Sequence, residues 1–105
     1  MFKKEKKLYV NSFERLHQVV LKNENINDQL IDLADKIISD CPVLVVFSEI
    51  SDEKMANYVS VFLSGVCYAL NGKTCLIGDE SYLFASSEAL KDGSINQYIK
   101  EMEQK

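Results

Sequence analysis

The side chains of this chain that could perform chemistry are few and scattered. Its three cysteines, Cys41, Cys67 and Cys75, have no Cys-x-x-Cys spacing, and the single histidine, His17, lies far from them in the sequence. Zinc sites use closely spaced Cys and His ligands, so we expect no bound metal and no other cofactor. We interpret the cysteines as reduced, mostly buried thiols of a cytosolic protein. A Cys–His nucleophile stays open as an alternative, because it depends on adjacency in space that a sequence does not show.

Two pairs of carboxylates are candidates for acid and base catalysis. Asp32 and Asp35 fall on the solvent side of an expected helix, and Asp79 and Glu80 fall in an expected turn. Such positions commonly carry solvated charge, whereas general acid–base catalysis needs positioned groups with matched pKa values. No glycine-rich phosphate loop, serine elbow or His–carboxylate pair accompanies them. We therefore predict that the protein is not an enzyme.

Length and charge predict one small domain with an acidic body. The 105 residues are 47% hydrophobic, which is enough for one core but not for two. Residues 1–22 carry six Lys/Arg against two acids, whereas residues 23–105 carry six against fourteen. An acidic body argues against nucleic-acid binding, although the basic start could meet an anionic membrane surface. The longest apolar run, 42–47, is too short to span a bilayer and no signal peptide is evident, so we expect a cytoplasmic protein.

Three segments have the apolar spacing of amphipathic helices. The first covers 26–38 with Asn27 as its expected N-cap, the second runs from a Ser51 cap to Asn71, and the third covers 94–102. Gly65 lies inside the second helix, where glycine costs roughly 0.5–1 kcal/mol relative to alanine. We therefore expect a neighbouring helix or strand to approach closely there. The second helix has an apolar stripe formed by Met55, Val59, Phe62, Leu63, Val66 and Leu70.

Four segments have strand character, and their order predicts the fold. The run 43–47 is apolar on both faces and suits a central strand, and a hairpin is expected further along the chain. The order β-α-β-α-β-β, followed by a short C-terminal helix, predicts an α/β two-layer sandwich with both main helices on one sheet face. We expect a second copy to cover the other face, in a homodimer through the sheet, with Val45 and Gly65 at oligomer interfaces. The expected strands are 18–21, 43–47, 73–77 and 81–85.

The second helix and the hairpin resemble a known family. Residues 59–72 read Val-Ser-Val-Phe-Leu-Ser-Gly-Val-Cys-Tyr-Ala-Leu-Asn-Gly, and Ile77-Gly78 and Tyr82-Leu83 follow them. This pattern is similar to the signature of the SepF cell-division family, whose members carry Phe-Leu-Ser-Gly on a helix, then Tyr-Ala, a glycine turn, Ile-Gly and an aromatic-Leu strand. The resemblance extends from about Val43 to Ile99 and reaches back more weakly to Val19.

The resemblance implies a cytoplasmic adaptor without enzymatic activity. Such a protein dimerises, associates further through its helices, and binds the C-terminal tail of the tubulin-like protein FtsZ. It thereby tethers or bundles FtsZ filaments at the inner face of the membrane during septum formation. The resemblance places the tail-binding surface at Ala56, Leu76 and Tyr82, where Tyr82 offers an aromatic wall. A basic residue is often found in the family at position 76, so Leu76 removes a cation that could pair with an acidic tail.

The first residues form a separate expected segment, 1–17, ahead of a core domain at 18–105. Family members carry a membrane-binding amphipathic helix at this end, followed by a long linker that is missing here. On a helical wheel the basic side chains fall opposite the apolar ones, which is typical of an interfacial helix on anionic lipid. The alternative is a terminal segment whose aromatic residues pack on the core. The apolar face of this wheel consists of Phe2, Tyr9, Phe13 and Leu16.

Three other interpretations stay open. The chain could be a small dimeric regulatory or ligand-sensing α/β domain, which needs a pocket with convergent polar groups. It could be a self-assembling structural protein that does not contact FtsZ. It could also be a divergent member of the family with a different partner. Ala56 and Tyr82 would then be an ordinary helix alanine and an ordinary strand aromatic.

Overall fold

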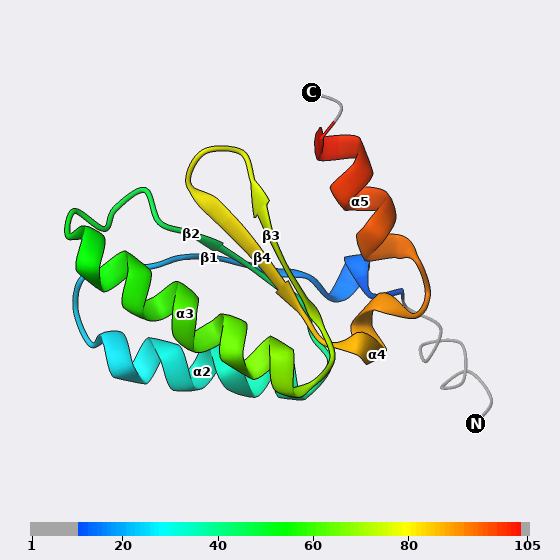
Figure 1. The fold of residues 1–105 in the computed structure, drawn as a ribbon, viewed down its shortest axis with the longest axis horizontal. Coiled ribbons are helices and arrows are strands. Elements are labelled where there is room, and N and C mark those ends of the chain that lie inside the picture. Colours follow the sequence, from blue (N-terminus) through cyan, green and yellow to red (C-terminus); the bar gives the residue numbers. More distant parts are fainter. Residues whose placement is uncertain (1–10, 104–105) are drawn as a thin grey trace.

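The computed structural model describes residues 11–103 as a sheet with a layer of two long helices (Figure 1). This arrangement confirms the predicted α/β class and most of the predicted segments. The four-residue helix α4 was not predicted, because it is too short to show a period. The elements in chain order are η1 (Phe13–Arg15), β1 (His17–Val20), α2 (Ile26–Ile38), β2 (Val43–Val46), α3 (Glu53–Ala69), β3 (Lys73–Ile77), β4 (Ser81–Ala85), α4 (Ser87–Leu90) and α5 (Ser94–Glu103).

The sheet has the strand order β1-β2-β4-β3. β1 runs parallel to β2, with Val19 opposite Val45, and β4 runs antiparallel to β2, with Tyr82 opposite Val45. β3 completes the hairpin as an edge strand, with Leu76 opposite Tyr82. Directly opposed residues share one face of a sheet, so Val19, Val45, Tyr82 and Leu76 form a row across it.

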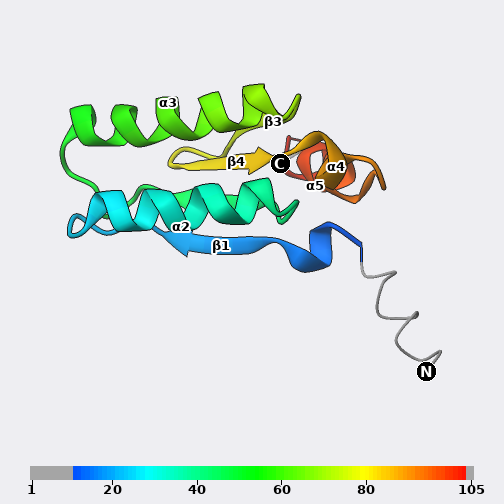
Figure 2. The same ribbon diagram turned by 90° about the horizontal axis from the view of Figure 1, so that it is seen from below.

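Helices α2 and α3 lie side by side on one face of the sheet, as predicted (Figures 1 and 2). Val45 is fully buried on this face, inside the core of its own chain. Side chains alternate along a strand, so Val43 and Val45 point to the helices while Leu44 and Val46 point to the opposite face. The interface predicted at Val45 therefore needs correction, because a second copy on the open face would meet Val46 instead. The core under the helices includes Leu30, Leu33, Ile37, Val43, Val45, Val59, Leu63 and Phe84.

The opposite face of the sheet is partly covered by α5. Ile95 and Ile99 of this helix are buried against Leu44, Ile77 and Leu83. The sequence pattern showed that this face is apolar, but it did not show that the chain's own last helix packs there. A second copy would therefore have to pack beside α5, over the part of the sheet that includes Val46, or displace the helix. The sheet-mediated homodimer stays a prediction on these terms.

The two long helices begin at caps that differ from the expected ones by one or two residues. Asn25, in a left-handed conformation at φ 53°, precedes α2, and Asp52 rather than Ser51 caps α3. The side chain of Asp52 accepts a hydrogen bond of 2.9 Å from the backbone N–H of Lys54. Asn27, the expected cap, instead accepts a hydrogen bond of 3.2 Å from the Tyr58 hydroxyl. Within residues 11–103, no helix has both the length and the hydropathy of a membrane span.

Candidate functional site

A groove with a volume of about 580 Å³ opens between the first half of α3 and the β3–β4 hairpin. The structure thus brings Ala56 and Tyr82 to one hollow, although they are far apart in the sequence. Leu76 lies opposite Tyr82 on the edge strand and is 52% exposed, but it does not line the groove. The lining residues are Phe47, Glu53, Ala56, Asn57, Ser60, Asp79, Glu80 and Tyr82.

Helical spacing explains the α3 wall of the groove. Glu53, Ala56, Asn57 and Ser60 stand at positions i, i+3, i+4 and i+7, which places them along one side of the helix. Sequence reasoning singled out Ala56 alone, although the same spacing would have found its three neighbours. Alanine presents only a methyl group here, so the wall stays low where it faces Tyr82.

Aromatic contacts hold the floor of the groove in place. The Tyr82 ring meets the Phe47 ring edge to face, with centroids 5.7 Å apart, and stacks near Phe84 at 6.2 Å. Aromatic pairs in these geometries contribute about 0.5–1.5 kcal/mol beyond their buried area. The backbone N–H of Phe47 donates a hydrogen bond of 2.7 Å to the carbonyl of Glu80, which joins the end of β2 to the hairpin turn. The partly buried Tyr82 side chain is therefore a fixed part of the groove floor.

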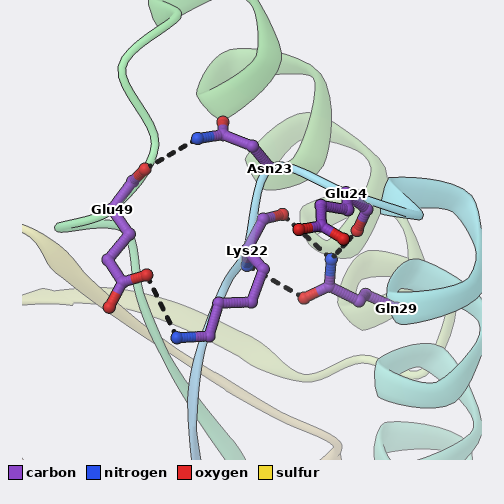
Figure 3. Close-up of polar contacts among 5 residues, drawn as sticks. All are labelled: Lys22, Asn23, Glu24, Gln29 and Glu49. Atoms are coloured by element: carbon purple, nitrogen blue, oxygen red, sulfur yellow. Dashed lines mark hydrogen bonds and ion pairs between the residues drawn. The ribbon is translucent and has the colours of Figure 1, made fainter.

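Polar contacts brace the loop that joins this floor to α3 (Figure 3). The side-chain amide of Asn23 donates to the backbone carbonyl of Glu49 at 3.0 Å, and Lys22 Nζ lies 3.0 Å from Glu49 Oε1. The Gln29 side-chain amide holds the loop before α2, because it donates to the backbone carbonyls of Lys22 and Glu24 at 2.9 and 2.7 Å. The exposed ion pair contributes at most about 1 kcal/mol. The hydrogen bonds to backbone carbonyls fix both the loop before α3 and the loop before α2.

The rim of the groove carries negative charge. Glu53 stands on the α3 side, while Asp79 and Glu80 stand on the hairpin, and all three are exposed. No Lys or Arg is among the lining residues in the described part of the chain. In residues 11–103 the ion pairs involve Glu49, Asp32 and Glu88, so none of them neutralises this rim. The groove is therefore an apolar floor between acidic walls.

A second surface, which we call the α3 outer face, consists of Tyr58, Val61, Phe62, Gly65 and Tyr68. Its four large side chains are 42–85% exposed. Phe62 belongs to the apolar stripe of the expected second helix, but it is exposed and not part of the core. A Cβ built on Gly65 meets none of the described residues within 4 Å. The predicted close contact at Gly65 is therefore absent within the described chain, and a contact with another copy stays a prediction.

The N-terminal residues of the predicted membrane face divide into two groups. Phe2 and Tyr9 lie outside the described residues. Phe13 belongs to the three-residue helix η1, and Leu16 is already extended (φ −65°, ψ 129°), so the expected helical face does not continue through Leu16. Phe13 packs against Tyr98 with ring centroids 5.2 Å apart, and Leu16 packs against the cluster under α5. Both side chains therefore pack against the domain, just before β1 begins.

Hydrogen bonds fasten the same segment to the start of α5. Asp92 Oδ2 accepts from the backbone N–H of Ser12 at 2.7 Å, and Ser94 Oγ accepts from that of Phe13 at 2.9 Å. The pKa of Asp92 is lowered to about 2, first because its carboxylate accepts from the backbone N–H of Ser94, and further because it accepts from Ser12. We call this set of contacts, together with the Phe13–Tyr98 pair, the N-terminal clasp.

Of the groups that could perform chemistry, Asp79 and Glu80 line the groove, whereas the cysteines and Asp32 do not. Cys67 is buried, and burial raises the pKa of its thiol, while Cys41 and Cys75 are partly exposed free thiols. Asp32 pairs with Lys36 at 2.8 Å on the surface of α2. Within the described part of the chain, no group of three or more His, Cys, Asp or Glu side chains could hold a metal ion.

The fold and the groove define a small α/β domain with a peptide-sized hollow beside its second long helix. A family model described as "Cell division protein SepF" matches residues 19–89. The chain belongs to the SepF family. A cell division protein SepF of Lactobacillus helveticus is 28% identical over 82 residues, which cover 78% of this chain and 56% of the relative. That of Carboxydothermus hydrogenoformans is 32% identical over 71 residues, which cover 68% and 51%.

The chain therefore spans about half the length of the curated relatives it matches. A solved structure, a SepF-like protein from Archaeoglobus fulgidus, superposes with a TM-score of 0.58 at 14% identity. The match covers 68% of this chain and 86% of that one. At this identity the likeness supports the fold alone, and the family assignment rests on the sequence matches.

Proposed function

We propose that this protein acts in cell division as an adaptor that binds the C-terminal tail of FtsZ in the groove between α3 and the hairpin. The observation that carries the proposal is that Ala56 and Tyr82, which the family resemblance nominates, line one groove. Family membership supports a role in division, since the relatives are named cell division proteins. By binding FtsZ tails, the protein links filaments to the inner face of the membrane.

The dimensions of the groove suit a short stretch of peptide. Its volume of about 580 Å³ lies within the range of about 300–1,000 Å³ that ligand sites occupy. An apolar side chain of the tail packs between the Tyr82 ring and the low wall at Ala56. Asn57 and Ser60 offer hydrogen-bonding groups to the backbone of the tail along the same wall. Binding energy concentrates in such buried anchors, so few residues of this surface dominate affinity.

Self-association is the second part of the proposal. The α3 outer face presents Tyr58, Val61, Phe62 and Tyr68 around Gly65, and aromatic side chains are enriched at protein interfaces. Pairing of these faces joins copies through their helices, leaving the groove on another side of α3 open. An adaptor with several linked grooves binds a filament with greater avidity than a single groove does.

Membrane attachment completes the proposed function and rests on residues 1–10. Four of these ten residues are lysines, and Phe2 and Tyr9 are aromatic. Anionic lipid attracts basic residues by about 1 kcal/mol each near the surface. The N-terminal clasp fixes the point at which this segment leaves the fold.

Titration of an FtsZ tail peptide into the protein tests the groove. We expect Tyr82→Ser and Ala56→Val each to weaken binding at least tenfold, or about 1.4 kcal/mol. The first removes the Tyr82 ring from the floor, and the second raises the low wall at Ala56 against the peptide. Matched controls are Tyr68→Ser and Ala69→Val, which change exposed residues outside the groove and should leave the affinity unchanged.

Thermal melts of all four variants exclude loss of folding as the cause. If both groove variants bind the peptide as tightly as the unmodified protein does, the tail site lies elsewhere. If the unmodified protein binds no FtsZ tail, the proposed partner is wrong.

A further inference from the structure

The groove combines two features that bear on the charge of its ligand. Its floor is apolar and fixed, because Phe47 and Tyr82 pack edge to face. Its walls carry carboxylates on both sides, with Glu53 on α3 and Asp79 and Glu80 on the hairpin turn. A peptide lying on the floor therefore runs between negative charges.

These carboxylates have no counter-charge in the described structure. The three ion pairs found in residues 11–103 leave all of them free. Lys54 follows Glu53 in the sequence, but it lines a neighbouring hollow together with Asp52 and Tyr58 instead of the groove. Leu76, the residue opposite Tyr82 on the edge strand, is apolar and adds no cation.

We propose that the groove selects a peptide whose apolar anchor is flanked by lysine or arginine. The aromatic floor positions the anchor, and the acidic walls discriminate between flanking charges. This inference rests on the proposed function for the location of the site only, and it assigns the bound segment a basic character instead of the acidic one expected of the tail. A segment flanked by acids meets repulsion from both walls and finds no cation among the lining residues.

The size of the effect follows from the exposure of the walls. A single exposed charge pair contributes little, but three carboxylates act together here. Interactions of this kind are screened over a Debye length of about 10 Å at 0.1 M salt and about 3 Å at 1 M. Discrimination should therefore be strong at low ionic strength and should fade as salt is added.

Two synthetic peptides provide the test. Both share a Leu-Phe-Leu core, and one carries two lysines on each side while the other carries two glutamates. Calorimetric titration into the full chain at low salt should give at least tenfold tighter binding for the lysine peptide. Raising the salt towards 1 M should reduce this ratio severalfold, because screening weakens attraction and repulsion alike.

Variants assign the discrimination to the groove. The combination Glu53→Gln, Asp79→Asn and Glu80→Gln should bring the ratio of the two affinities close to one. The combination Glu24→Gln, Asp35→Asn and Glu103→Gln changes the net charge equally at exposed residues outside the groove, so it should preserve most of the ratio. Tyr82→Ser should weaken binding of both peptides.

The outcomes separate this inference from the proposed function. Binding of the glutamate peptide as tightly as the lysine peptide overturns the inference, as does a ratio that survives neutralisation of the three groove carboxylates. Failure of both peptides to bind also overturns it. An FtsZ tail peptide is titrated in parallel. If the lysine peptide binds and the tail does not, the choice of FtsZ fails while the inference stands.

Discussion

Gly72 occupies a position where the backbone of a neighbouring segment leaves no room for a side chain. It follows Asn71, which has a φ of 54°, and its N–H donates a hydrogen bond of 2.7 Å to the carbonyl of Cys67 at the end of α3. A Cβ at this position would overlap the carbonyl oxygen of Ala85 and lie 2.9 Å from the Cα of Ser86. The obstruction is backbone, which cannot move aside as the tip of a flexible side chain can.

We predict that Gly72→Ala lowers the free energy of unfolding by about 3 kcal/mol, the upper part of the range for overpacked sites. Gly78→Ala is the matched control, because Gly78 has a φ of 73° but open space around it. Its loss should be only about 1 kcal/mol, the cost of a left-handed alanine. Urea denaturation measures both. Equal losses in the two variants would mean that backbone conformation, not overlap with Ala85, constrains Gly72.

The sequence was informative about single residues of the groove where the family resemblance applied. Ala56 and Tyr82 were nominated by resemblance, and the groove contains both of them. Phe47, Asp79 and Glu80 were not assigned to this surface, because they come from a strand end and a turn, whose relative positions depend on the tertiary fold. Leu76 was nominated with the others, but it is not among the residues that line the groove.

At the scale of elements, α3 serves three surfaces at once. One side buries Val59 and Leu63 against the sheet, a second lines the groove through Ala56, and the third is the α3 outer face. Helical periodicity identifies the buried side most clearly, because burial demands apolar residues. It does not separate an apolar residue of the core from one such as Phe62, which is exposed within the single chain.

We predict that Gly65→Lys disrupts association through the α3 outer face without destabilising the domain. The site has open space in the single chain, and lysine has a higher helix propensity than glycine by roughly 0.5–1 kcal/mol. The melting temperature should therefore stay level or rise, while sedimentation velocity shows smaller assemblies. Ser39→Lys adds the same charge just beyond the end of α2 and serves as the control.

The prediction for Gly65 has a clear opposite result. Assemblies of unchanged size would show that no copy contacts this residue. A large fall in melting temperature would show that lysine disturbs the domain itself, which the open space around the glycine argues against.

At the scale of the whole molecule, α5 reduces the sheet surface that remains for a partner. Ile95 and Ile99 cover the region around Leu44 and Leu83. Val20 is 36% exposed, and Val46, its neighbour on the same face, is partly buried. The periodicity of the strands showed that both faces of the sheet are apolar. It did not show that α5 would cover part of one face and leave the rest exposed.

We predict that the protein dimerises through this remaining surface at micromolar concentration. Val20→Glu should remove the sheet-mediated dimer while the domain stays folded, because it places a charge in the sheet contact but not in the core. Val45→Glu should instead unfold the domain, since an unpaired charge buried in the core costs several kcal/mol. Light scattering gives the mass, and circular dichroism reports the folding. A monomeric mass for the unmodified protein would exclude the dimer.

The N-terminal clasp also determines how the molecule would carry a mechanical load. Figure 1 shows the described chain entering near α4 and α5, whereas the groove lies towards the opposite end, at the start of α3 and the hairpin turn. A filament held in the groove and a membrane held by residues 1–10 would therefore stretch the domain along its length. The pull would reach the bonds from Ser12 and Phe13 to Asp92 and Ser94 before it reached β1. If residues 1–10 are attached to a membrane as proposed, the clasp would take up this load and keep the edge strand β1 paired with β2.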